Sequence, residues 1–270
     1  MNQIDIYKLL NKTNCGDCKV RSCMGFAVSV MNGERKLSDC PHLDVKTLSK
    51  IEGAIRVRDQ REDIEKLIDP LKEKIALVDF QSVAAGLGAE FKSDMLAITC
   101  LGKEFLLDRR GDIHTLCHVN PWLRAPLLHY TINSGNAELT GEWISYGGLK
   151  NGIIMDQYFT KRCEEPLRDL ADKHEGFLED IFTIFKGKAI HIENADISWI
   201  ISPFPKVPFL VMYWKAEKQL KGEIPFESKL KILFDKSTDN YLNNEIIYVL
   251  GRGLVEMFTK ICIKHYDIIL

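Results

Sequence analysis

The sequence lacks the features that mark membrane, secreted and nucleic-acid-binding proteins. Its longest apolar runs, such as 207–214, are far shorter than the ~20 residues that a membrane-spanning helix needs. The N-terminus has an early acidic residue and no apolar core with a small-residue cleavage site, so no signal peptide is evident. The formal net charge is only −2, whereas nucleic-acid binders usually carry a basic domain or stripe. We therefore expect a cytoplasmic protein that binds neither membrane nor nucleic acid.

Several catalytic motifs are also missing. The sequence contains no P-loop, no Gly-x-Ser-x-Gly and no His-Glu-x-x-His, so the common NTPase and hydrolase classes lose support. A Gly-Arg-Gly triplet at 251–253 falls inside a helical pattern and lacks the strand–turn–helix setting of a dinucleotide site. We expect these two glycines to permit close helix packing instead.

The eight cysteines fall into two groups. Cys15, Cys18, Cys23 and Cys40 have the spacing C-x2-C-x4-C-x16-C, and the other four are scattered over the rest of the chain. Three thiols on one short loop and a fourth on a returning segment suit a cubane cluster, whereas structural zinc usually shows two separated close pairs. Pro41 follows the last cysteine, as at the end of the bacterial ferredoxin run, and turns the chain away. We favour a [4Fe-4S] cluster, with zinc and free thiols as alternatives.

Two further features of this segment fit a cluster. Gly16 lies between the first two cysteines, where the lack of a side chain lets backbone amides approach inorganic sulfide. Residues 1–60 hold 10 basic and 7 acidic residues. This modest positive excess can offset the negative charge of four thiolates.

The order of residues around the cysteines resembles a known family. The segments 7–18, 22–27 and 40–43 are similar to the small four-cysteine iron–sulfur domain of the corrinoid iron–sulfur protein large subunit, which also recurs in redox activators of corrinoid proteins. This resemblance implies a [4Fe-4S] cluster and a redox partner protein or corrinoid protein as partner. Lys19 departs from the glycine that is common there, which bears on loop shape and local charge.

The chain as a whole predicts an α+β fold. We expect a small helical iron–sulfur module over 1–43, a helical linker over 44–75 and a larger mixed domain of helices and strands over 76–270 with a long C-terminal helix. Expected helices cover 4–10, 24–31, 44–57, 62–71, 121–130, 155–174, 175–185 and the chain from about 241. Expected strands cover 95–101, 104–108, 112–116, 197–201, 207–214, 229–234 and the surroundings of Ile190, the first three as hairpins.

The larger domain also looks familiar. It is similar to an uncharacterised domain of anaerobic bacteria and archaea that is commonly fused behind the same iron–sulfur module. The similarity covers most of residues 75–265 and lies in segments 84–91, 121–130, 141–143, 162–166, 205–208 and 233–235. It implies a two-part architecture, but the family supplies no established activity.

Trp122, His129, Trp143 and Arg162 are the candidate cofactor-binding residues of this domain. Large aromatic side chains with a few convergent polar groups suit a pocket for a planar or bulky cofactor. A histidine such as His129 can serve as an axial ligand to a corrinoid or another tetrapyrrole. The alternative is that these are core aromatic residues, a core histidine and a surface arginine.

A cluster held by four cysteines has no open iron position, so its usual work is to move one electron. We expect one-electron transfer to a low-potential cofactor, a corrinoid or similar, on a partner or in the second domain. Two alternatives stay open. One is an enzyme or cofactor-binding protein with a ligand pocket in its second domain, and the other is a redox sensor. No catalytic residue can be assigned.

Overall fold

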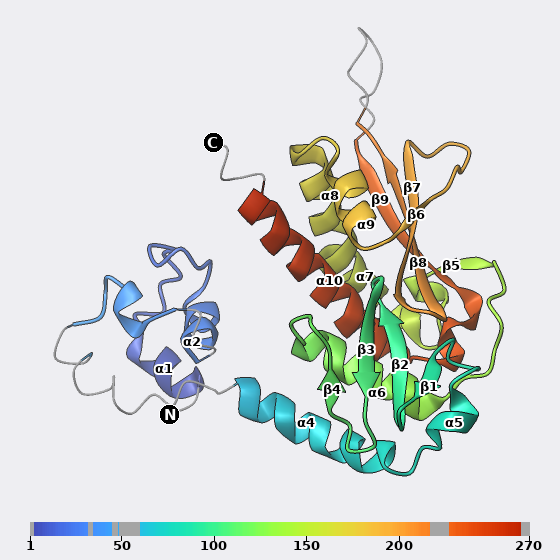
Figure 1. The fold of residues 1–270 in the computed structure, drawn as a ribbon. Coiled ribbons are helices and arrows are strands. Elements are labelled where there is room, and N and C mark those ends of the chain that lie inside the picture. The colour runs from blue at the N-terminus through green and yellow to red at the C-terminus, as the bar shows by residue number, and fades with distance from the viewer. Residues whose placement is uncertain (1–2, 32–34, 45–47, 49–59, 217–226, 266–270) are drawn as a thin grey trace, which may run out of the picture. The chain divides into compact units, whose positions relative to one another are not determined.

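The computed structural model describes residues 3–31, 35–44, 48, 60–216 and 227–265, with the backbone alone over 60–67. The chain divides into two compact units, Met1–Leu67 and Ile68–Leu270 (Figure 1). The structure confirms the α+β class: a small helical region precedes a domain with two antiparallel sheets and a long C-terminal helix. No helix in the described ranges is both long and apolar enough to cross a membrane.

The first unit is built around two short helices. These are α1 (Gln3–Leu9) and α2 (Cys23–Met31), followed by the single 3-10 turn η1 (Leu37–Asp39). Both helices were expected from their apolar spacing. They pack together through fully buried side chains, among them Ile6, Phe26 and Ala27.

The predicted linker is described only in part. Its first expected helix, 44–57, lies mostly outside the described residues. The second is present as α4 (Gln60–Ile75), longer than the predicted 62–71. Ile68, Leu71 and Ile75 are buried and recur at helical spacing, so one stripe of α4 joins the core of the second unit.

The first sheet of the second unit is an antiparallel meander. Its strands follow one another in chain order as β1 (Glu90–Lys92), β2 (Met95–Cys100), β3 (Lys103–Leu107) and β4 (Ile113–His114). Ser93 and Asp94, and then Leu101 and Gly102, have positive φ in the two tight turns. Two successive residues of positive φ match the twist of a hairpin. The expected hairpins are confirmed, because β2 pairs with β3 and β3 with β4, whereas the β1–β2 hairpin was not predicted.

The second sheet gathers strands from across the domain. It consists of β5 (Trp143–Ser145), β6 (Lys188–Ala189), β7 (Ile197–Phe204), β8 (Val207–Trp214) and β9 (Lys229–Asp235), in the order β5-β9-β8-β7-β6. Pro208 is the second residue of central strand β8, so it stands at a strand start as expected. The strand expected around Ile190 is shorter and ends at Ala189.

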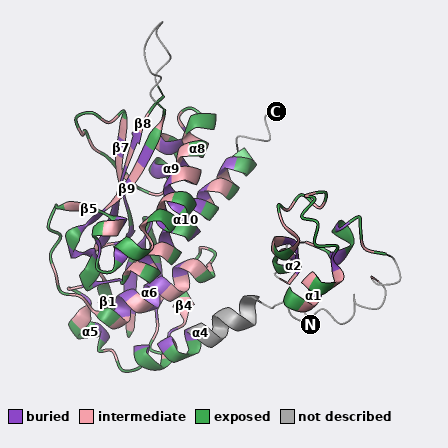
Figure 2. Ribbon diagram, turned by 180° about the vertical axis from the view of Figure 1, so that it is seen from behind, coloured by how far each residue is buried: buried purple, intermediate pink, exposed green. Residues whose placement is uncertain are grey.

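Helices make up the rest of the domain. They are α5 (Phe80–Val83), α6 (Pro121–Asn133), η2 (Tyr146–Gly148), η3 (Gly152–Ile154), α7 (Asp156–Phe159), the π-helical turn η4 (Thr160–Glu164), α8 (Glu165–Lys173), α9 (Phe177–Ile184), η5 (Lys236–Asn240) and α10 (Asn244–His265). α10 packs against α6 and α8, and its inward face is buried while its outer face is exposed (Figure 2).

The closing helix begins at Asn244, three residues later than expected. The buried Asp235 carboxylate caps η5, which begins at Lys236, by accepting hydrogen bonds from the backbone N–H and hydroxyl of Ser237. Tyr241 is fully buried, and its hydroxyl donates to the carbonyl of Ala137 and lies 3.2 Å from the carbonyl of Gly86. These contacts keep the residues before Asn244 out of the α-helical conformation.

The glycines of α10 serve packing, as expected. A Cβ added at Gly253 would lie 2.2 Å from the indole of Trp122, and one at Gly251 would lie 2.9 Å from the ring of Phe159. Both distances are shorter than real Cβ contacts. The two glycines therefore let α6 and α7 approach the axis of α10.

We expect Gly253→Ala to lower the free energy of unfolding by about 1–2 kcal/mol, because overpacking against Trp122 outweighs the better helix propensity of alanine. Denaturant unfolding monitored by circular dichroism measures the change. Arg252→Ala, at the exposed neighbouring position, should stay within about 0.5 kcal/mol of the parent. A more stable Gly253→Ala would contradict the packing role.

Asp235 supplies a second test, through pH. Burial opposes ionisation, but hydrogen bonds from Ser237, Thr140 and Gly141 prevail and hold the pKa of Asp235 below its usual value. A carboxylate with a lowered folded-state pKa stabilises the fold above its unfolded pKa, and that stabilisation is lost as the pH falls through the folded value. We expect Asp235→Asn to cost about 2–3 kcal/mol at neutral pH. The difference from the parent should shrink below about pH 4, and a constant difference would refute this account.

Candidate iron–sulfur site

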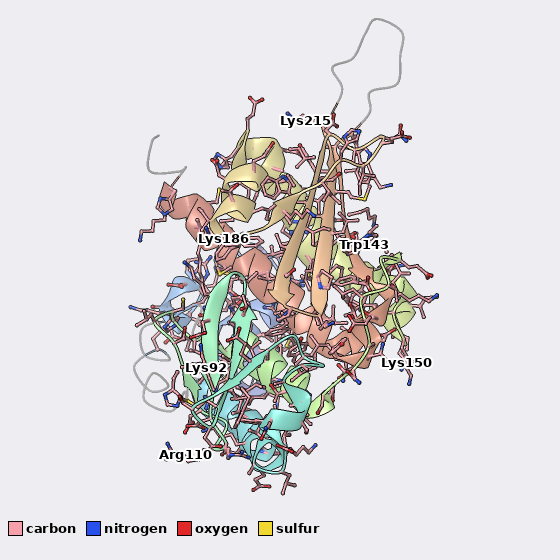
Figure 3. All side chains as sticks on the ribbon, turned by 45° about the vertical axis from the view of Figure 1, so that its right-hand side comes forward. Lys92, Arg110, Trp143, Lys150, Lys186 and Lys215 are labelled. Atoms are coloured by element: carbon pink, nitrogen blue, oxygen red, sulfur yellow. The ribbon has the colours of Figure 1, made fainter. Side chains whose placement is uncertain are left out.

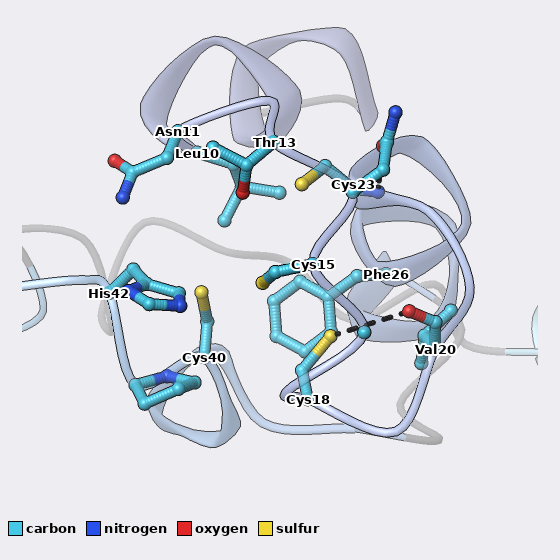
Figure 4. Close-up of a pocket in the computed structure, with 13 residues that line it drawn as sticks. Leu10, Asn11, Thr13, Cys15, Cys18, Val20, Cys23, Phe26, Cys40 and His42 are labelled. Atoms are coloured by element: carbon cyan, nitrogen blue, oxygen red, sulfur yellow. Dashed lines mark hydrogen bonds between the residues drawn. The ribbon is translucent and has the colours of Figure 1, made fainter.

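The four cysteines of the first group line one hollow in the first unit. Figure 4 shows their side chains around it, together with His42 and Phe26. Cys15 and Cys18 come from the loop after α1, Cys23 begins α2, and Cys40 follows η1. The fold of this unit thus brings together residues that are up to 25 positions apart, Cys15 and Cys40.

Left-handed backbone shapes the ligand loop. Lys12, Asn14, Gly16 and Lys19 all have φ between 52° and 81°. The N–H of Lys19 donates to the carbonyl of Gly16 at 2.7 Å, which closes a tight turn around Cys18. A Cβ at Gly16 would meet nothing within 4 Å, so its positive φ, rather than crowding, is what favours glycine there.

Side-chain hydrogen bonds fasten this loop to α2. The side-chain oxygen of Asn14 accepts from the N–H of Cys23 at 2.8 Å, and the hydroxyl of Ser22 accepts from the N–H of Gly25 at 3.1 Å. Both satisfy donors at the start of the helix. These bonds fix Cys23 at the start of α2.

The fourth cysteine arrives on a tight turn. Cys40 is 9% exposed, and its carbonyl accepts from the N–H of Leu43 at 3.3 Å across a turn with Pro41 in second position. Proline is favoured at that position of a turn. The chain therefore turns away directly after Cys40, as the sequence predicts.

An ion pair links the two ends of the ligand set. Nε2 of His42 lies 2.7 Å from a carboxylate oxygen of Asp17. Hydrogen bonds from His42 and then from Cys15 lower the pKa of Asp17. The pair joins the loop between the first two cysteines to the segment after the last one.

The donor set fits a metal cluster. The four thiols face a hollow whose wall includes the buried side chains of Leu10 and Phe26. A single tetrahedral zinc ion needs its four sulfurs within ~2.3 Å of one point. Among the described residues, the donors close enough to share one ion are Cys15, Asp17 and His42, and not a set of cysteines. The wider spacing of the thiols fits a larger inorganic core.

Comparison with known proteins matches two separate parts of the chain to two families. Residues 10–42 match a family described as "Putative Fe-S cluster". Residues 79–257, about two thirds of the chain, match the family described as "Domain of unknown function (DUF3786)". The chain belongs to the DUF3786 family. Its N-terminal part is an iron–sulfur cluster region related to subunits of corrinoid iron–sulfur proteins.

The curated relatives are similar over the N-terminal part. The chain is 44% identical over 52 residues to the "Acetyl-CoA decarbonylase/synthase complex subunit gamma" of Methanopyrus kandleri, which covers 19% of this chain and 11% of the relative. It is 33% identical over 51 residues to the "Corrinoid/iron-sulfur protein large subunit" of Moorella thermoacetica, with the same two shares. The chain thus spans about a tenth of the length of these relatives. No solved structure matches it.

The four candidate cofactor-binding residues of the second unit lie on three different elements. Trp122 and His129 lie on α6, Trp143 on edge strand β5 (Figure 3) and Arg162 on the π-helical turn η4. Trp122 packs on Gly253 of α10, and Arg162 is exposed. Hollows of this unit occur elsewhere, for instance beside Tyr213. A ligand site at the four residues stays a prediction.

His129 is half-buried on α6. Burial, and then the charge of Lys74, lower its pKa. Its imidazole is therefore neutral at pH 7, which is the form that binds metals.

Sequence reasoning did not single out several polar residues that the structure shows to be important. The buried Glu164 carboxylate in η4 accepts hydrogen bonds from Thr160, Lys231 and the N–H of Ile232. Asp17 and His42 are likewise brought together from distant positions. The sequence hinted at the Asp17–His42 pair only by the position of Asp17 between Cys15 and Cys18 and of His42 directly after Cys40-Pro41.

The positive φ of Lys19, +61°, gives a test of the ligand loop. Glycine adopts this conformation freely, whereas a β-branched residue is strained there by about 1–2 kcal/mol. We expect Lys19→Gly to hold as much iron as the parent and Lys19→Val to hold less after anaerobic reconstitution. Arg21→Val is the matched control, since Arg21 is not among the residues of positive φ and should keep its iron. Equal iron in both valine variants would show that loop conformation does not limit cluster binding.

Proposed function

We propose that this chain is a one-electron carrier that holds a [4Fe-4S] cluster on Cys15, Cys18, Cys23 and Cys40. The acceptor is a low-potential cofactor, a corrinoid or similar, on a partner protein or in the second unit. The observation that carries the proposal is the convergence of four cysteines on one hollow of the first unit.

The ligand set favours electron transfer over catalysis at iron. Four cysteines occupy the outer coordination position of every iron in a cubane, so no iron is left open for substrate. The protein contributes the hollow, its apolar wall and the amides of the ligand loop, which set the reduction potential. Three of the other four cysteines, Cys100, Cys163 and Cys262, are buried in the second unit, and burial raises the pKa of Cys163 to about 12, so these three do not compete for iron.

The names of the relatives support the class of acceptor. One is called a corrinoid/iron–sulfur protein large subunit, and others are gamma subunits of acetyl-CoA decarbonylase/synthase complexes. The similarity is confined to the iron–sulfur region. It therefore supports a role as electron donor and does not extend to the whole reaction of the relatives.

Anaerobic purification tests the cofactor. We expect about four iron and four acid-labile sulfide per chain, with a broad visible absorption that bleaches on reduction by dithionite. Cys23→Ala should lose most of the iron, since Cys23 is a ligand. Cys117→Ala should keep it, since that half-buried cysteine lies in the second unit. A colourless protein that carries zinc would overturn the proposal.

The same preparation tests the acceptor class. Reduced protein mixed with hydroxocobalamin should return to the oxidised spectrum while the corrinoid spectrum shows reduction of cobalt. Cys23→Ala should be inactive in this assay. A stable reduced cluster in the presence of hydroxocobalamin would argue against a corrinoid acceptor.

A further inference from the structure

The four cysteines of the hollow differ in exposure. Cys15 is exposed, Cys18 and Cys23 are half-buried and Cys40 is buried. Leu10 and Phe26, which also line the hollow, are both buried. Because electron transfer weakens steeply with distance, the exposed ligand marks the edge at which a redox partner comes closest.

Three basic side chains belong to the ligand loop but do not line its hollow. Leu10, Asn11, Thr13 to Gly16, Cys18 and Val20 line the hollow, whereas Lys12, Lys19 and Arg21 do not. The basic positions thus interrupt the run of lining positions, and all three side chains are exposed. We call Lys12, Lys19 and Arg21 the basic edge.

The charges of the basic edge are available to a partner. In the described part of the chain none of the three makes an ion pair within 4.0 Å, and Lys12 only lies over the ring of Tyr7 at 5.7 Å. The acid of the same loop, Asp17, is engaged by His42 at 2.7 Å. The ligand loop therefore presents three exposed cations and one carboxylate that already has a hydrogen-bond partner.

We propose that electrons leave the cluster at Cys15 and that the basic edge docks this face of the unit onto an acidic surface of the acceptor protein. The inference rests on the proposed function and adds the partner's chemistry. Complementary charge steers two proteins into an encounter and fixes their orientation. Charge at the exit edge therefore sets the rate at which the correct acceptor is reached.

An acidic protein fits this edge better than a nucleic acid does. Nucleic-acid binding normally uses a basic domain or stripe, whereas this chain carries a net charge of −2 and only three cations at this edge. Three cations suit a docking contact that forms and separates quickly, as electron carriers need.

Small inorganic oxidants of opposite charge test the sign of the exit edge. In each case the reduced cluster gives one electron to the oxidant: hexacyanoferrate(III) becomes hexacyanoferrate(II), and hexaammineruthenium(III) becomes hexaammineruthenium(II). Stopped-flow absorbance gives both rates at about 0.01 M and about 0.15 M ionic strength. We expect added salt to slow the anionic oxidant and to speed the cationic one.

Charge reversal identifies the residues. The triple variant Lys12→Glu, Lys19→Glu, Arg21→Glu should slow the anionic oxidant by on the order of tenfold at low salt and speed the cationic one. A change in cluster potential would move both rates in the same direction, so opposite shifts identify surface charge.

A matched control makes the same change in net charge elsewhere. Lys103, Lys150 (Figure 3) and Lys161 are exposed lysines of the second unit. Their triple reversal to glutamate makes the same change in net charge outside the ligand loop. We expect it to change both rates by less than the triple reversal of Lys12, Lys19 and Arg21 does.

The outcomes separate this inference from the proposed function. A chain without a reducible cluster would overturn both. A reducible cluster whose oxidation by the anionic probe speeds up with salt, or responds equally to both triple variants, would overturn the basic edge alone.

Macromolecular probes then decide the class of partner. Poly-L-glutamate should slow oxidation by hexacyanoferrate(III) in the parent and not in the variant reversed at Lys12, Lys19 and Arg21. A random single-stranded DNA oligomer could instead slow this oxidation at concentrations where poly-L-glutamate has no effect. That result would assign the basic edge to nucleic-acid binding and overturn the proposal of an acidic protein partner.

Discussion

In the proposed cluster, metal–thiolate bonding would be the interaction on which the first unit depends. Among the described residues its hydrophobic core is small, with seven buried residues around Phe26 and Ala27, and one of the seven is Cys40. Domains of about 40 residues rarely hold together without metals, disulfides or oligomerisation. The loop also holds several residues in left-handed backbone, which is unfavourable unless other interactions fix it. Ligation of the proposed cluster would therefore be coupled to folding of this unit, and the cofactor would be structural as well as functional.

The second unit depends instead on buried polar side chains that join distant segments. The hydroxyl of Tyr130 donates to the carbonyl of Leu87 at 2.6 Å and accepts from the N–H of Lys206 at 3.2 Å. Its ring stacks on Phe204 with centroids 4.9 Å apart. Three of the family-like segments, 84–91, 121–130 and 205–208, thus meet at one side chain. Asp235 does the same for the segments around 141–143 and 233–235. The family-like segments therefore have a structural role, because their residues hold distant parts of the fold together. This explains why the family can be recognised from these segments although they do not indicate a reaction.

The parts of the fold that could be predicted from the sequence are those with local causes. The apolar spacing of α2 and α6 and the tight turn at Gly102 follow from residues close in the chain. The late start of α10 could not be predicted, because it results from contacts of Tyr241 with residues more than 100 positions away. The gathering of four cysteines at one hollow could be predicted, because three of them share one short loop and the fourth lies on a returning segment. That they are the ligands of a cluster stays a proposal. Trp122 shows the limit, since an aromatic residue in a polar context suggested a pocket, while its neighbour in space is a glycine on another helix.

In the proposed electron carrier, the exposure of the four cysteines would meet two opposing demands. Burial of Cys40 in the apolar core of the unit would limit access of water to the site and favour retention of the cluster. Exposure of Cys15 shortens the path to an acceptor but opens the same site to solvent and oxidants. The pairing of Asp17 with His42 joins the ligand loop to the Cys40 segment and leaves Cys15 exposed. The site would thus be covered enough to keep iron and exposed enough at Cys15 to pass electrons. The charge of the basic edge would then select the acceptor protein.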